Sequence, residues 1–370
     1  MTTLLSPSVR DARPANLARA APAGADIFGN QPFIVIWEAT RACDLACRHC
    51  RADAHTERDP GELKTDEVKA MLTRIAEGFG PVVLVITGGD PAKRSDLVEL
   101  IAHGAKAGLQ MALTPSATPL VTPDLLKRCQ DAGLHRIAFS LDGADAATHD
   151  GFRQVAGTFD RTLALLDVAK GLGLGTQINT SVAQHDRAHL RAIAAFGNAK
   201  KISLWSVFLL VPTGRTKTDM LLSAAEHEKV YRELADIALD PTTTFQVKTT
   251  AGQPYYRVLA QERERRGTPA PNVHAGRGVN DGNGFLFISH TGEICPSGFL
   301  PTPCGNTRWD DPVDIYRHHP LFLSLRDADN FSGKCGRCEF RKVCGGSRSR
   351  SFGLTGDPTA SDPTCVYQPR

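Results

Sequence analysis

The sequence predicts an α/β protein: an open, partial TIM-type (β/α)6 barrel of parallel strands with a small cysteine-rich subdomain at its C-terminal end. Three observations support this prediction. Short apolar runs rich in β-branched residues alternate with helix-like segments between residues 33 and 211. A polar or glycine-rich cluster stands at the C-terminal end of each run, and most of the ten cysteines lie in two groups near the ends of the chain.

The alternation of strands and helices indicates a parallel sheet, because a helix returns the chain between parallel strands. Thr65, followed by Asp66 and Glu67, is expected to cap a helix, as is Thr122 before Pro123. The six runs expected as strands are residues 33–39, 82–86, 110–114, 136–141, 176–182 and 202–211. The glycines expected to end helices are Gly78, Gly104, Gly133 and Gly171.

The clusters at the strand ends are expected to meet on one face of the barrel. In a barrel of parallel strands, the C-terminal ends of all strands lie together, and active sites are built there. We therefore predict a functional site on this face. The clusters are CDLACRHC (43–50), TGGDP (87–91), TPSAT (114–118), SLDG (140–143), INTSV (178–182) and PTGR (212–215).

Composition excludes several classes of protein. A net charge of +3 gives no strong field for nucleic acid, and no apolar run is long enough for a membrane span. Without a signal-peptide pattern we expect a cytoplasmic protein, where grouped cysteines indicate metal ligation rather than disulfides. We expect a flexible tail at 1–30, the barrel at 31–240, and a linker with the cysteine-rich domain at 241–370.

The first cysteine group consists of Cys43, Cys47 and Cys50, at the spacing C-x3-C-x2-C with no fourth cysteine nearby. A structural zinc site would need a fourth ligand. Together with GGDP, SLDG, HDGFRQVAGTF (149–159) and PTGR, this motif resembles the radical S-adenosylmethionine (radical SAM) superfamily over about residues 33–365. The resemblance implies an iron-sulfur oxidoreductase in which the three catalytic cysteines hold a [4Fe-4S] cluster.

In this superfamily the open iron of the cluster chelates S-adenosylmethionine (SAM), whose reductive cleavage yields a 5'-deoxyadenosyl radical that abstracts hydrogen from a substrate. The resemblance also implies which residues bind the cofactor. Glycines let the backbone approach the methionine moiety, and a guanidinium suits its carboxylate. Asp90 departs from the glutamate usual at its position. The residues so assigned are His49, Gly88, Gly89, Asp90, Ser140, Arg153 and Asn179.

The second cysteine group resembles the SPASM extension of the superfamily, which carries auxiliary [4Fe-4S] clusters. It comprises Cys335, Cys338, Cys344 and Cys365. Arg348 stands where a further cysteine of the full pattern is expected, and Cys295 and Cys304 supply only two more thiolates upstream. The resemblance therefore implies one auxiliary [4Fe-4S] cluster, with a structural zinc held by the same four thiolates as the alternative.

The segments VCGGSRSRSFGLTGD and DPTC, with PTGR, are similar to radical SAM enzymes of haem and haem d1 synthesis. The resemblance implies a small-molecule tetrapyrrole substrate modified on a propionate side chain, and an electron donor such as flavodoxin or ferredoxin. Two alternatives stay open: a maturase of a ribosomally made peptide, and a non-catalytic iron-sulfur electron carrier. The residues before Phe33 are too few for the peptide-recognition domain of many maturases. Candidate partners for propionates are Arg215, Arg257, Arg348 and Arg350.

Overall fold

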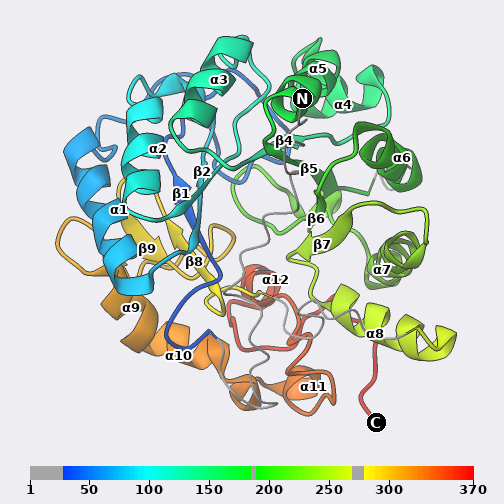
Figure 1. Cartoon of the computed structure of the whole chain (residues 1–370). Coiled ribbons are helices and arrows are strands. Elements are labelled where there is room, and N and C mark those ends of the chain that lie inside the picture. The colour runs from blue at the N-terminus through cyan, green and yellow to red at the C-terminus, as the bar shows by residue number, and fades with distance from the viewer. Residues whose placement is uncertain (1–27, 185–188, 269–278) are drawn as a thin grey trace, which may run out of the picture.

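The computed structural model describes residues 28–184, 189–268 and 279–370 (Figure 1). One sheet runs through it, with the strand order β10-β9-β8-β1-β2-β3-β4-β5-β6-β7. The strands from β8 to β7 in this order pair in parallel, whereas β9 and β10 pair antiparallel at one end. Helices α1 to α7 cover the outer face, and the cysteine-rich segment follows below (Figure 1). The predicted open, partial barrel is confirmed.

The six predicted strands are all present and adjacent in chain order. They are β1 (Ile34–Glu38), β2 (Val83–Thr87), β3 (Gln110–Leu113), β4 (Arg136–Ser140), β5 (Gly175–Val182) and β6 (Leu204–Leu209). Four further strands were not predicted: β7 (Gln246–Thr250), β8 (Phe285–Ile288), β9 (Glu293–Cys295) and β10 (Gly305–Asn306). Because β8 pairs with β1, the sheet continues without a break from the barrel into the C-terminal region.

The helices of the barrel are α1 (Thr65–Phe79), α2 (Leu97–Lys106), α3 (Pro123–Asp131), α4 (Ala146–Arg153), α5 (Thr158–Gly171), α6 (Leu190–Lys200), α7 (Ala224–Leu239) and α8 (Pro254–Arg266). The C-terminal helices are α9 (Pro312–His318), α10 (Pro320–Arg326), α11 (Gly333–Gly336) and α12 (Arg348–Thr355), and the short 3-10 helices are η1 (Pro91–Lys93), η3 (Thr218–Met220) and η4 (Ala328–Asn330). Thr122 caps α3 as predicted, since its hydroxyl accepts from the Leu125 amide at 3.1 Å. Thr65 is instead the first residue of α1, and its hydroxyl donates to Asp96 at 2.7 Å.

Two of the glycines expected to end helices lie inside them. Gly78 belongs to α1, where a Cβ would meet Val313 of α9 at 2.3 Å, so a glycine there permits close helix packing. Gly104 lies in α2, where a Cβ would meet the sulfur of Met111 at 2.5 Å. Gly133 follows α3 with a φ of +99°, as expected, whereas Gly171 is the last residue of α5. Packing therefore explains glycines that local pattern had assigned to helix ends.

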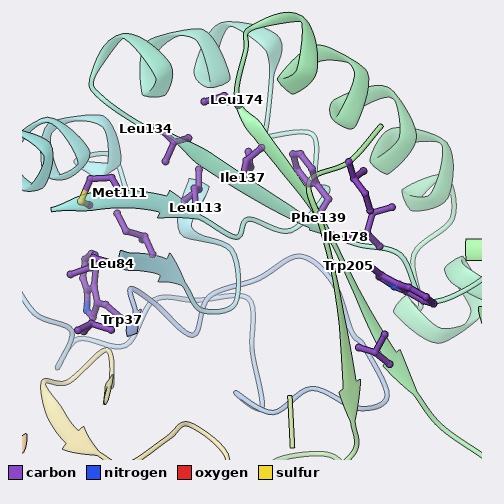
Figure 2. Packing of buried hydrophobic residues seen from close by; sticks show 14 of the residues in the cluster. Trp37, Leu84, Met111, Leu113, Leu134, Ile137, Phe139, Leu174, Ile178 and Trp205 are labelled. Atoms are coloured by element: carbon purple, nitrogen blue, oxygen red, sulfur yellow. The ribbon is translucent and has the colours of Figure 1, made fainter. Parts of the chain in front are cut away.

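The main hydrophobic core lies between the sheet and the surrounding helices (Figure 2). In β2 and β5 buried residues alternate with partly exposed ones, so one face of the sheet packs on the helices. Trp205 is buried, and its indole nitrogen donates to the Thr180 hydroxyl at 2.9 Å. The other face leaves room at the C-terminal strand ends, which is where the site lies.

Of the tail predicted at residues 1–30, residues 1–27 lie outside the described part of the chain. Residues 28–30 pack on the C-terminal helices: the Tyr316 hydroxyl donates to the Phe28 carbonyl at 2.6 Å, and Arg326 donates to that of Gly29 at 2.8 Å. Among the described residues, no helix combines the length and apolar character needed to cross a membrane.

Candidate active site

The three cysteines of the first group line one hollow at the C-terminal ends of the strands. It has a volume of about 980 Å³, part of it open to solvent. Each sulfur accepts an N–H group: Cys43 from the Leu45 amide at 3.4 Å, Cys47 from Arg153 at 3.6 Å, and Cys50 from the Ala54 amide at 3.4 Å. The loop therefore presents three sulfurs to one space, each with a donor that stabilises negative charge on it.

The PTGR segment after β6 holds the cysteine loop in place. The Arg215 amide donates to the Cys50 carbonyl at 2.9 Å, and the Thr216 hydroxyl donates to the His49 carbonyl at 3.2 Å. Gly214 has a φ of +62°, and a Cβ there would lie 2.4 Å from the Cys50 carbonyl oxygen. A glycine is required because both the backbone angle and the lack of space exclude a side chain.

The two glycines after β2 serve a similar purpose at the start of the same loop. Their segment lies against the backbone of residues 40–42, and a Cβ on Gly88 would come within 2.2 Å of the Thr40 carbonyl oxygen. Both Gly88 and Gly89 line the hollow. Asp90 does not line it, because its buried carboxylate accepts from the Ala92 amide at 3.1 Å and from the Thr118 hydroxyl at 2.6 Å. The structure thus places Asp90 behind the site.

Arg153, at the end of α4, lines the hollow with its guanidinium already paired. Its Nε and Nη2 lie 2.6 and 2.5 Å from the buried carboxylate of Asp142, which also accepts from the Ser181 amide at 2.7 Å. Burial opposes ionisation of Asp142, but the charge of Arg153, together with the nearby histidines and the Ser181 amide, lowers the pKa of Asp142 on balance. Arg153 is thereby fixed with its Nη1 directed at Cys47.

Ser140, at the end of β4, and Asn179, within β5, also line the hollow. Ser116 was not singled out from the TPSAT cluster, although it lies 3.4 Å from the Cys43 sulfur and donates to the Gly89 carbonyl at 2.8 Å. The ring of His49 stacks on Phe152 with centroids 4.1 Å apart. Burial and the nearby charge of Arg153 lower the pKa of His49 to about 3, so its ring is neutral. Its Nδ1 is buried without a hydrogen-bond partner in the described structure.

The second cysteine group lines another hollow, of about 350 Å³ and partly open to solvent. Backbone N–H groups donate to sulfurs of this group, among them that of Gly346 to Cys344 at 3.3 Å and that of Asp362 to Cys335 at 3.4 Å. The four cysteines of the group are Cys335, Cys338, Cys344 and Cys365. Within the described ranges, no three His, Cys, Asp or Glu side chains gather closely enough to hold a single metal ion.

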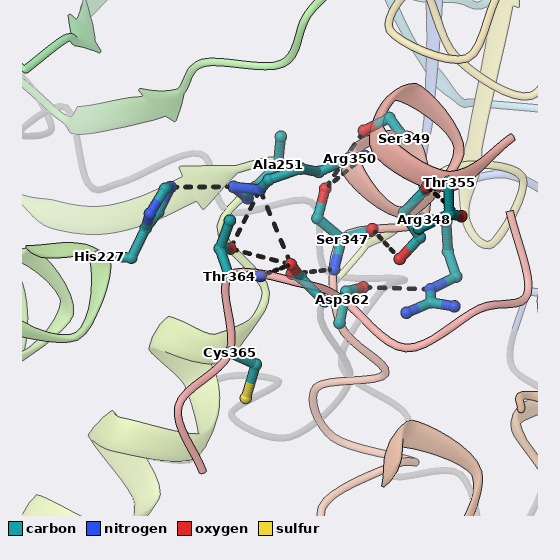
Figure 3. A network of polar contacts seen from close by, with 12 residues as sticks. His227, Ala251, Ser347, Arg348, Ser349, Arg350, Thr355, Asp362, Thr364 and Cys365 are labelled. Carbon is teal, nitrogen blue, oxygen red and sulfur yellow. Dashed lines mark hydrogen bonds and ion pairs between the residues drawn. The ribbon is translucent and has the colours of Figure 1, made fainter. Parts of the chain in front are cut away.

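Arg348 and Arg350, candidates for binding a substrate carboxylate, are both fully buried beside this second group (Figure 3). Arg348 donates to the carbonyls of Pro358 and Ala360 at 3.0 and 2.8 Å, and its Nη2 lies 3.6 Å from the Cys335 sulfur. Arg350 donates to Thr364 and Ala251 and contacts His227 and Asp362. Both guanidiniums are used within the protein, which corrects the expectation that they meet a substrate.

The other candidate cations do not line the hollow of the first group. Arg257 is buried and pairs with Glu228 at 2.5 Å, while Arg215 donates to the Ala54 carbonyl at 3.2 Å. Neither lines the hollow, whereas Arg51, which sequence reasoning missed, does. Arg51 directly follows Cys50, and this position next to the cysteine motif was the sequence signal that could have identified it as a site residue. Phe208, Phe299 and the run Leu209–Val211 add an apolar wall.

Comparison with known proteins gives consistent matches. Residues 37–196 match the model of the Radical SAM superfamily. The chain is 39% identical over 344 residues to an AdoMet-dependent heme synthase of Nitratidesulfovibrio vulgaris, covering 91% of this chain and 93% of the relative. It is 34% identical over 345 residues to one of Methanosarcina barkeri, covering 92% and 98% of the two chains. AdoMet is another abbreviation of S-adenosylmethionine.

The fold is also found among solved structures. Streptococcus suis SuiB bound to S-adenosylmethionine matches with a TM-score of 0.70 at 17% identity, over 91% of this chain and 78% of that one. The structure of SuiB bound to its precursor peptide SuiA matches with a TM-score of 0.69 at 18% identity, over 91% and 76%. At such identities the likeness concerns the fold.

Proposed function

This chain belongs to the radical SAM superfamily, and we propose that it modifies a propionate side chain of a tetrapyrrole at the hollow lined by Cys43, Cys47 and Cys50. Members of the superfamily use a [4Fe-4S] cluster and SAM, which, when bound, supply the electron and the 5'-deoxyadenosyl radical for hydrogen abstraction from the substrate. The chain's own residues bind, orient and enclose these groups. The single observation that carries the tetrapyrrole assignment is the 39% identity, over nearly the whole of both chains, to an AdoMet-dependent heme synthase.

The three-cysteine loop suits a cluster by the chemistry of its donors. Burial raises the pKa of the Cys43 and Cys47 thiols, so thiolates there need cationic partners, which iron provides. The N–H donors to all three sulfurs are the kind of outer contact that stabilises ligating thiolates. The loop offers three sulfurs and no fourth, which suits a cluster with one open iron.

SAM fits the rest of this hollow. Gly88 and Gly89 leave a bare backbone edge, and Ser140 and Asn179 offer polar side chains beside it. The unpartnered, buried Nδ1 of His49 is a polar atom that a complementary group on the adenine can meet. Arg153 is held by Asp142 with one nitrogen at the Cys47 sulfur, so we propose that it positions positive charge between thiolate and cofactor. Asp90 supports this rim from behind without touching the hollow.

We propose that Cys335, Cys338, Cys344 and Cys365 hold the auxiliary [4Fe-4S] cluster. Four cysteine sulfurs that line one hollow are the usual protein ligands of a [4Fe-4S] cluster. The buried Arg348 beside Cys335 supplies a further N–H donor to this site. The barrel at 31–240 would then carry the radical chemistry, and the region 241–370 the auxiliary cluster, with a flavodoxin or ferredoxin as electron donor.

The test is anaerobic turnover of the iron-loaded protein with SAM, a reductant and a tetrapyrrole, followed by mass spectrometry of the porphyrin. The tetrapyrrole is Fe-coproporphyrin III, which carries four propionate side chains. We expect loss of mass from propionate side chains, accompanied by 5'-deoxyadenosine. An unchanged porphyrin, with SAM cleavage equal to that in its absence, would contradict the tetrapyrrole assignment.

Two rival functions make different predictions in the same assay. A peptide maturase is favoured by the fold shared with SuiB, which was solved with its precursor peptide. It would modify a candidate precursor peptide and leave the porphyrin intact. An electron carrier would release no 5'-deoxyadenosine with either substrate. The 39% identity to an AdoMet-dependent heme synthase exceeds the 28% identity to a PqqA peptide cyclase over a similar share of this chain, which favours the tetrapyrrole.

A further inference from the structure

We propose that Arg51 binds a carboxylate of the substrate and so selects an acidic tetrapyrrole. The inference rests on the proposed function and deepens it, because it names the residue that recognises the substrate's charge. Arg51 lies beside the cysteine loop, on the wall of the hollow that also includes Phe208 and Phe299. Neither the motif nor the family resemblance assigned it a role.

The structure holds Arg51 in one orientation. Its Nη2 donates to the buried carboxylate of Glu38 at 2.6 Å, and its guanidinium lies 5.0 Å from the ring centroid of Phe287. Glu38, at the end of β1, is in turn contacted by His290 at 2.9 Å and by Arg41 at 3.6 Å. A Cβ on Gly298 would lie 2.9 Å from Arg51 Nη1, so the glycine leaves space for the guanidinium.

The remaining donors of Arg51 are free to bind a ligand. In the described structure its Nε and Nη1 make no hydrogen bond or ion pair, and its side chain is 20% exposed. Arginine presents its N–H groups as a rigid planar fork that matches a carboxylate. Because Arg41 also lies 3.6 Å from Glu38, the two arginines share one negative charge, and the positive charge of Arg51 is only partly neutralised.

The composition of the hollow points to the same ligand chemistry. Among the described residues that line it, the cations are Arg51 and Arg153, and the fork of Arg153 is taken by Asp142. The ring centroids of Phe208 and Phe299 lie 6.3 Å apart. Leu209, Leu210 and Val211, which follow Phe208 in the chain, line the same hollow. An apolar wall with one available cation suits a large, flat, apolar molecule that carries a carboxylate at its edge.

A purely structural role is the competing explanation, since Arg51 also joins the cysteine loop to β1 through Glu38. Such a role predicts that replacing Arg51 weakens folding or iron loading, without regard to the charge of a ligand. Ligand recognition predicts a loss confined to carboxylate-bearing porphyrins. Two porphyrins of the same shape and different charge therefore distinguish the two roles.

The experiment titrates the iron-loaded protein, with SAM present, against Fe-coproporphyrin III and against its tetramethyl ester, following the porphyrin absorbance. Wild type should bind the acid more tightly than the ester. Arg51→Gln should weaken binding of the acid by about 10- to 100-fold, the usual range for a hydrogen-bonded charge, and leave the ester, iron content and SAM binding unchanged. The control Arg58→Gln removes a 42% exposed charge that pairs with Glu62, outside the hollow and away from Glu38, and should keep the wild-type preference.

Wild-type preference for the acid in Arg51→Gln would overturn this inference and leave the proposed function intact. A wild type that binds neither porphyrin would overturn the proposed function and this inference with it. If Arg51→Gln fails to retain iron, chemical labelling of the wild-type protein tests the same inference. Butanedione labelling of Arg51, read by mass spectrometry, should be blocked by the acid but not by the ester, and equal labelling with both would refute the role.

Discussion

Asp142→Asn should destabilise the protein through the buried pair that orients Arg153. Asp142 is 1% exposed, and its carboxylate takes two nitrogens of Arg153 at 2.6 and 2.5 Å and the Ser181 amide at 2.7 Å. The amide of asparagine has nearly the same shape and still accepts from Ser181, but it leaves the buried guanidinium without its counter-charge. Removing one partner of such a pair costs about 3–5 kcal/mol.

The assay is urea unfolding of the iron-loaded protein under anaerobic conditions. A loss of this size should lower the midpoint by roughly 1 M, given the denaturant dependence of larger domains. The control is Asp124→Asn in α3, which breaks a 2.9 Å ion pair with Arg128. The side chains of Asp124 and Arg128 are 78% and 57% exposed, so this variant should leave the midpoint unchanged. Equal midpoints for Asp142→Asn and Asp124→Asn would refute the reasoning that this buried pair holds the rim of the site.

Two further predictions concern the loop contacts and pH. Gly214→Ala should lower the iron content of the protein, because the new Cβ would lie 2.4 Å from the Cys50 carbonyl oxygen. The control is Gly267→Ala, at nearly the same φ of +61° but with nothing within 4 Å of the new Cβ, and it should load iron normally. Equal iron content in the two variants would contradict the clash at Gly214. Burial, reinforced by Arg350, lowers the pKa of His227 from 6.5 to about 4, so its contribution to stability is complete above pH 6.5 and is lost as pH falls toward 4. His227→Gln should therefore flatten the dependence of the urea midpoint on pH in this window, and an unchanged slope would exclude His227 as its source.

Five of the six barrel strands could be predicted because they are short apolar runs, and β5 (GTQINTSV) because its β-branched residues alternate with polar ones between two helical segments. β7 was missed because its sequence, QVKTT, is polar and its strand lies at the edge of the sheet. β8 pairs with β1 across about 250 residues of chain, and no local signal predicts which strand a short run such as FLFI joins. Fold class was thus accessible from sequence, whereas the continuation of the sheet was decided by tertiary pairing.

The site residues divide in the same way. Motif spacing located the cysteines and glycines that line the hollow, because backbone geometry and metal ligation demand those residue types. The pairing of Arg153 with Asp142 could not be predicted, since it joins the ends of two elements in space. Arg348 was expected to meet a substrate, yet it is buried by donating to backbone carbonyls near the second cysteine group. Side-chain partners set these roles, and spacing does not reveal partners.

The central claim is that two separate cysteine groups hold two clusters and that only the first cleaves SAM. It is tested most directly by measuring iron and 5'-deoxyadenosine in wild type and in a variant with Cys43, Cys47 and Cys50 all replaced by Ala. Wild type should contain about eight irons per chain and release 5'-deoxyadenosine, while the variant should keep about four irons and release none. Undiminished cleavage of SAM in the variant would contradict the claim, as would zinc in place of its remaining iron.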